Sequence, residues 1–108
     1  MMKKYKFVIL GAGPSGLTLA HALLDAGYAQ NEILVVEQQA LAGGLCRSEN
    51  VDGAPLDIGG GHFLDVKHKN VLDFLFRFMP REEWNLHDRV SKIRIRGMEV
   101  DHPLEANL

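Results

Sequence analysis

Three glycines near the amino terminus have the spacing of a phosphate-binding turn. Gly11, Gly13 and Gly16 form a G-x-G-x-x-G pattern. Such glycines allow a sharp turn, a close approach of the backbone to a pyrophosphate and tight packing of the following helix. Glu37 follows Gly11 by 26 positions, and a carboxylate placed there accepts hydrogen bonds from a ribose diol but repels a 2′-phosphate. These residues predict binding of a dinucleotide such as FAD or NAD rather than NADP.

The glycine pattern lies where a strand gives way to a helix. An apolar run predicts a strand over 5–10 that is buried on both faces, as in parallel sheets. Apolar residues at helical spacing predict a helix over 14–26, with Pro14 suited to its first turn and Gly27 to its end. We expect the N–H groups at the start of this helix, that of Ser15 among them, to hold the phosphates.

A second apolar strand over 33–36 leads directly into Glu37. Strand, helix and strand in this order predict a βαβ unit with parallel strands and a right-handed crossover. We therefore expect the α/β class and a Rossmann-like dinucleotide-binding fold. Half of such a fold needs three parallel strands and the sequence offers two, so we expect an incomplete sheet. The rest of a longer chain, or a second subunit, is expected to complete it.

The sequence beyond Glu37 predicts four further features. They are a loop over 38–50, a second glycine-rich turn over 57–61, a helix over 67–79 and a hairpin over 90–100. We interpret the whole chain as the N-terminal portion of a nucleotide-binding domain. Within it, residues 1–60 hold the βαβ unit and the glycine-rich loops, and residues 61–108 hold the helix and the start of an inserted hairpin region.

Composition and charge argue against several kinds of partner. A formal net charge of −2 gives no general attraction to nucleic acid or to an anionic membrane. Glycines interrupt the apolar stretch over 7–24, unlike a signal peptide or a membrane span. The single cysteine, Cys46, cannot close an internal disulfide, which favours the reducing cytoplasm. The spacing of His62, Asp65 and His68 lacks a close-packed ligand set, so we assign no metal.

The segment after Glu37 resembles a motif of a known flavoprotein superfamily. Glu37, the paired Gly43 and Gly44, and Arg47 reproduce the E-x5-G-G-x2-R extension of the amine oxidase and protoporphyrinogen oxidase superfamily. The resemblance implies FAD as cofactor, with the paired glycines and Arg47 along its pyrophosphate and ribityl chain. It also implies hydride transfer to the flavin from a small-molecule substrate such as an amine.

A second resemblance covers the later part of the chain. The segment Asp57-Ile-Gly-Gly-Gly-His-Phe63, followed by the expected helix and hairpin, is similar to UDP-galactopyranose mutases. Those proteins place a G-x-H-aromatic loop beside the isoalloxazine ring, which implies flavin contacts for Gly60, Gly61 and His62. Asp65 stands where mutases have a second histidine. This resemblance implies a UDP-sugar-like substrate.

Together these features predict the FAD-binding segment of a flavin-dependent, amine oxidase-like oxidoreductase that holds the ADP part of FAD. One alternative is a flavoenzyme similar to UDP-galactopyranose mutase, without net redox. Another is an NAD-binding or non-catalytic dinucleotide-binding module. We assign no catalytic residue, and expect the segment alone to be inactive. The candidate cofactor contacts are Gly11, Gly13, Pro14, Ser15, Gly16, Glu37, Gln38, Gly43, Gly44, Arg47, Gly60, Gly61 and His62.

Overall fold

The computed structural model describes residues 2–61 and 63–107 of the 108-residue chain. The chain divides into two compact units, Met1–Leu64 and Asp65–Leu108. His62, which we expected beside a flavin ring, lies outside the described residues. Within those residues, no helix combines the length and the apolar character that crossing a membrane requires.

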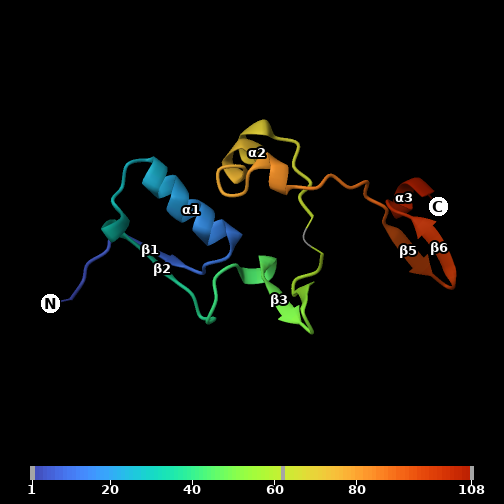
Figure 1. Ribbon diagram of the computed structural model, residues 1–108, viewed down its shortest axis with the longest axis horizontal. Coiled ribbons are helices and arrows are strands. Elements are labelled where there is room, and N and C mark those ends of the chain that lie inside the picture. Colours follow the sequence, from blue (N-terminus) through green and yellow to red (C-terminus); the bar gives the residue numbers. More distant parts are fainter. Residues whose placement is uncertain (1, 62, 108) are drawn as a thin grey trace. The chain divides into compact units, whose positions relative to one another are not determined.

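The first unit is built on the expected βαβ arrangement (Figure 1). Its elements are β1 (Phe7–Leu10), α1 (Pro14–Asp25), the short 3-10 helix η1 (Gln30–Glu32) and β2 (Ile33–Val36). Strands β1 and β2 pair in parallel, with Phe7 opposite Ile33 and Leu10 opposite Val36. The predicted α/β unit is therefore confirmed, and its sheet holds two strands among the described residues.

Local sequence accounts for both ends of α1. Pro14 occupies the first helical turn, where its missing N–H costs no hydrogen bond. Gly27 adopts a φ of +94° after the helix, and Tyr28 N–H donates to the Leu23 carbonyl at 3.1 Å. The Tyr28 ring then meets Phe7 of β1 edge to face, with 4.7 Å between ring centroids. This contact fixes the chain beside the first strand as it leaves the helix.

Strand β1 is covered on one face and open on the other, so our expectation of a strand buried on both faces was wrong. Ile9 is 8% exposed, whereas Val8 and Leu10 are 56% and 82% exposed. Side chains alternate between the faces of a strand, and α1 covers one face of a sheet of two strands. The strand also begins at Phe7 rather than at residue 5.

Part of the stretch 38–50, expected to be a loop, is regular structure. It contains the 3-10 helix η2 (Gly44–Cys46) and strand β3 (Ser48–Val51), which pairs antiparallel with β4 (Ala54–Asp57). Asp52 and Gly53 connect the strands with φ values of 52° and 83°, as a two-residue turn with positive φ at both positions requires. The Ser48 hydroxyl donates to the Asp57 carboxylate at 2.6 Å and closes the base of this hairpin.

In the second unit, the expected helix is present but shorter than predicted. Helix α2 spans Lys69–Leu75 rather than 67–79. Phe76 ends it, and the Arg77 and Phe78 amides donate to carbonyls three residues earlier. The 3-10 helix η3 (Arg81–Glu83) follows.

The predicted hairpin over 90–100 is confirmed in the second unit (Figure 1). Strands β5 (Lys92–Ile95) and β6 (Met98–Asp101) pair antiparallel, and Arg96 and Gly97 form the turn with φ values of 49° and 82°. A short helix that the sequence did not predict, α3 (Leu104–Asn107), follows the hairpin.

Candidate dinucleotide-binding site

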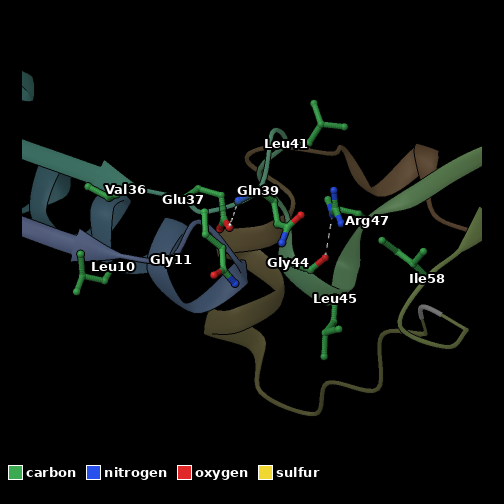
Figure 2. Close-up of a pocket in the computed structure, with 11 residues that line it drawn as sticks. Leu10, Gly11, Val36, Glu37, Gln39, Leu41, Gly44, Leu45, Arg47 and Ile58 are labelled. Carbon is green, nitrogen blue, oxygen red and sulfur yellow. Dashed lines mark hydrogen bonds between the residues drawn. The ribbon is translucent and has the colours of Figure 1, made fainter.

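An open groove of about 710 Å³ lies in the first unit, where β1 and β2 end (Figure 2). Ligands of open parallel sheets bind at the carboxyl ends of the strands. Figure 2 shows the last residues of the two strands on one side of the groove and the Gly44–Arg47 segment on the other. The lining residues are Leu10, Gly11, Val36, Glu37, Gln38, Gln39, Leu41, Gly44, Leu45, Arg47 and Ile58.

The three glycines of the first turn differ in whether the structure requires glycine at their positions. Gly11 has a φ of +105°, which side chains disfavour. A Cβ on Gly16 would collide with the Gly11 carbonyl oxygen and lie 3.3 Å from Cγ2 of Ile9. A Cβ on Gly13 would meet only the Gly44 Cα, at an ordinary 3.8 Å. Packing among the described residues therefore requires glycine at position 16 but leaves room at position 13.

The start of α1 offers backbone donors to an anion. Gly13 is the N-cap residue, and among the described residues no side chain caps the helix and no acidic residue lies in its first turn. The first N–H groups of a helix have no carbonyl partner within it. The amides of Ser15 and Gly16 belong to this turn, so they and the helix dipole favour a bound negative charge.

Glu37 joins the end of β2 to the glycine turn. Its Oε2 accepts a hydrogen bond from Ala12 N–H at 2.8 Å, and its Oε1 accepts one from Gln39 N–H at 2.9 Å. The Gln39 amide, and then that of Ala12, lower the pKa of the Glu37 carboxyl below its usual 4.5. The side chain is therefore ionised at neutral pH. A carboxylate has about four acceptor positions, so two remain for other donors.

The Gly43–Arg47 loop packs directly against the first glycine turn. Gly43 N–H donates to the Ala12 carbonyl at 2.7 Å. Gly44 has a φ of +56°, and a Cβ there would lie 3.1 Å from the Cα of Gly13. The two glycine segments thus approach through their backbones, and a side chain at position 44 would separate them.

Arg47 completes the charged part of the groove. Its Nε donates to the Gly44 carbonyl at 3.3 Å, and the residue is half-buried. This bond turns the side chain back along its own loop (Figure 2). A guanidinium has five N–H donors, so most of them stay available for an oxyanion. The groove therefore holds a carboxylate on the strand side and a guanidinium on the loop side.

The structure brings part of the predicted set together in the groove, namely Gly11, Glu37, Gln38, Gly44 and Arg47. Gly13, Pro14, Ser15 and Gly16 form the start of α1 and Gly43 starts the adjoining loop, next to the groove rather than along it. Gly60 and Gly61 follow β4 and are not among the described residues that line the groove.

Sequence reasoning missed the apolar wall of the groove and the amide of Gln39. Leu10 and Val36 are the last residues of β1 and β2, and the rule that ligands bind where parallel strands end could have identified them. Leu41, Leu45 and Ile58 come from loops and carry no comparable signal.

Comparison with known proteins supports the Rossmann-like fold of the chain. Residues 9–78 match the NAD(P)-binding Rossmann-like domain family. A Methanothermococcus thermolithotrophicus protein named "Uncharacterized protein in nifH2 3′ region" is 50% identical over 95 residues, which cover 82% of this chain and 88% of that protein. The UDP-galactopyranose mutase of Mycoplasma pneumoniae is 30% identical over 97% of this chain and 24% of its own length. The putrescine oxidase of Kocuria rosea is 45% identical over 49% of this chain and 10% of its own length.

The chain thus spans about a quarter of the mutase and a tenth of the oxidase. The resemblance to the amine oxidase superfamily and to UDP-galactopyranose mutases is confirmed by these matches. The family match runs through β1, α1, β2 and the Gly43–Arg47 loop, and so includes both glycine segments and Glu37. The chain belongs to the NAD(P)-binding Rossmann-like domain family.

Proposed function

We propose that this chain binds the ADP part of FAD as the dinucleotide-binding segment of a flavin-dependent oxidoreductase. The observation that carries the proposal is that an ionised Glu37 and Arg47 line the same groove, beside the start of α1. A ribose diol can donate to the carboxylate, while a diphosphate can accept from the guanidinium and the helix amides.

The space at Gly13 supports a ligand at this turn. Packing among the described residues does not require glycine at position 13, so there is room for a group that approaches the backbone closely. The diphosphate of a dinucleotide is such a group, because it binds the amides at the start of the helix at close range. Gly13, Pro14, Ser15 and Gly16 would then lie beside the phosphates, and Glu37 and Gln38 beside the ribose.

Charge favours FAD or NAD over NADP, because the Glu37 carboxylate repels a 2′-phosphate. The resemblance of the Gly43–Arg47 loop to the flavoprotein extension favours FAD over NAD. The name of one relative, the putrescine oxidase, agrees with an oxidoreductase. We therefore place Gly43, Gly44 and Arg47 along the diphosphate. On the resemblance of the segment 57–63 to UDP-galactopyranose mutases alone, we propose flavin contacts for Gly60, Gly61 and His62.

When bound, the flavin supplies hydride acceptance from a small-molecule substrate. The residues of this chain hold and orient the ADP part. We propose that the remaining strands of the sheet come from the rest of a longer chain or from a second subunit, because β1 and β2 alone leave Val8 and Leu10 exposed. The chain's single cysteine favours the cytoplasm as its location.

An absorption spectrum of the native full-length protein, with chromatography of the released cofactor, tests the proposal. We expect a flavin spectrum and release of FAD. A colourless protein that is not reconstituted by FAD but binds NAD would overturn the flavin assignment and leave an NAD-binding domain. A protein that binds neither dinucleotide would overturn the proposed function altogether.

A mutase-type flavoenzyme is the second candidate. The similarity to the UDP-galactopyranose mutase of Mycoplasma pneumoniae extends over 97% of this chain, compared with 49% for the putrescine oxidase. Adding UDP-galactose to the reduced flavoprotein separates the two functions. A change in the flavin spectrum that depends on the UDP-sugar favours the mutase, whereas oxidation of an amine with reduction of the flavin favours the oxidase.

A further inference from the structure

Gly59, which follows the β3–β4 hairpin, packs directly against the Gly43–Arg47 loop. A Cβ on Gly59 would collide with the Leu45 carbonyl oxygen and lie 2.9 Å from the Leu45 Cβ and 3.1 Å from its carbonyl carbon. The φ of Gly59 lies outside the left-handed region, so conformation alone does not require glycine there. The close approach to the Leu45 peptide is what requires it.

A backbone hydrogen bond fixes the same contact one residue earlier. Ile58 N–H donates to the Arg47 carbonyl at 3.2 Å. The hairpin that joins Arg47 to Ile58 is closed at its base by the bond between Ser48 and Asp57. The chain therefore leaves the loop at Arg47 and returns to support it from the other side.

The loop is thus held between two glycine contacts. On one side, Gly43 is bonded to Ala12, and a Cβ on Gly44 would lie 3.1 Å from Gly13. On the other side, Gly59 meets the peptide of Leu45. Both contacts involve backbone atoms, which are displaced less easily than the ends of flexible side chains. The position of the loop, and of the Arg47 guanidinium bonded to it, follows from them.

We infer that Gly59 is a positioning residue, which sets the distance of the Gly43–Arg47 loop from the first glycine turn and so the place where Arg47 meets a diphosphate. Gly59 acts through the Leu45 peptide and not by touching the ligand. This inference rests on the proposed dinucleotide site. A Cβ at position 59 pushes the loop away from its support and moves Arg47 within the groove.

Two measurements on the full-length protein test the inference, with ADP as the probe. Calorimetry should show that Gly59→Ala weakens ADP binding about tenfold, while Leu56→Ala, a change on the exposed strand β4, leaves it unaltered. Alkylation of Cys46, which is exposed within the same loop, should change in rate in Gly59→Ala but not in Leu56→Ala. Equal behaviour of the two variants would overturn the inference.

A double-mutant cycle with Arg47 separates positioning from general loosening. If Gly59 acts through the placement of Arg47, then Gly59→Ala should weaken ADP binding far less in an Arg47→Ala background than in the native one. Additive losses would contradict the inference. If the native protein does not bind ADP, the proposed function fails, but the alkylation rates of Cys46 still decide whether Gly59 positions the loop.

Hydrogen exchange in the native protein tests the inference without requiring that the Gly59→Ala variant folds. In the native protein, ADP should slow exchange of Ile58 N–H, which is bonded to the loop, and leave Gly53 N–H unchanged. Gly53 N–H is bonded to the Asn50 side chain at the tip of the hairpin, 3.0 Å away. Unchanged exchange at Ile58 on saturation with ADP would count against a coupled loop and support.

Discussion

The Glu37 carboxylate accepts a hydrogen bond from Ala12 N–H at 2.8 Å and thereby ties the end of β2 to the glycine turn after β1. One residue thus serves two purposes in the proposed site. It holds the turn in place through the Ala12 amide, and it keeps free acceptor positions for a ribose diol.

Replacing Glu37 should therefore affect both binding and stability. We expect Glu37→Ala to weaken FAD binding about tenfold, because the ribose loses a charged acceptor. The melting temperature should fall as well, because Ala12 N–H loses its partner. Titration calorimetry and thermal melting measure the two effects. Glu49→Ala, on the exposed strand β3, is the matched control and should change neither. Unchanged FAD affinity in Glu37→Ala would remove Glu37 from the site.

The lowered pKa of Glu37 predicts how its contribution depends on pH. A carboxyl whose pKa is lower in the folded protein stabilises the fold above its unfolded pKa and loses this effect as the pH falls through the folded value. The stability difference between the native protein and Glu37→Gln should thus be full at neutral pH and shrink below the usual pKa of 4.5. Urea unfolding at pH 7 and at pH 4 or lower measures it. A difference that does not shrink in acid would contradict the assignment.

The sequence predicts the βαβ unit well because its signals are local. The strand over 33–36 agrees with β2, and the ends of α1 follow from Pro14 and Gly27. The burial of β1 could not be predicted from local sequence signals. A continuous apolar run predicts cover on both faces, but that cover depends on elements remote in the sequence, and Leu10 remains 82% exposed.

Two predictions were wrong for separate reasons, the loop over 38–50 and the length of helix α2. The β3–β4 hairpin carries a signal that was overlooked, since Asp52-Gly53 is a favoured two-residue turn, although polar residues and Pro55 weaken its strand pattern. The early end of α2 goes with side-chain contacts that apolar spacing does not reveal. Trp84 donates to the Met79 carbonyl at 2.8 Å and packs edge to face on Phe76, so the chain turns back where periodicity alone would continue the helix.

In the candidate site, too, the features with a local sequence signal were predicted and those that depend on other contacts were not. Glu37 and Gly11 are placed by the βαβ unit, so their pattern was sufficient to bring them together. The contribution of Gln39 is made by its backbone amide, which any residue could supply, so its identity gives no clue. The support of the Gly43–Arg47 loop by Gly59 depends on the β3–β4 hairpin, which our sequence analysis did not predict.

Gly13 and Gly16 should respond differently to the same substitution. Gly16→Ala places a methyl group against the Gly11 carbonyl, and we expect a loss of about 1–3 kcal/mol in the free energy of unfolding. Gly13→Ala has room in the protein and should cost less than about 1 kcal/mol, the loss of a glycine N-cap. Its FAD affinity should nevertheless fall about tenfold or more, because the methyl group meets the diphosphate.

Urea unfolding and titration with FAD separate these two effects. The prediction for Gly13 is contradicted if Gly13→Ala keeps the native FAD affinity. In that case, the room at Gly13 would have no ligand to explain it. The prediction for Gly16 is contradicted if Gly16→Ala is as stable as the native protein.

Arg47 should contribute to the binding of the ligand's phosphates and not to the binding of its nucleoside. A guanidinium that pairs with a diphosphate contributes through charge-assisted hydrogen bonds of about 1.5–3 kcal/mol, which correspond to a tenfold or greater loss of ADP affinity in Arg47→Ala. Arg47→Lys should restore part of this loss, because the charge returns without the forked geometry. Arg94→Ala removes the same charge from an exposed position on β5 and should leave ADP binding unaltered. Adenosine lacks phosphates, so calorimetry should find its weaker binding equal in the native protein and in Arg47→Ala. An equal loss for adenosine and ADP would place Arg47 at the nucleoside instead of the diphosphate.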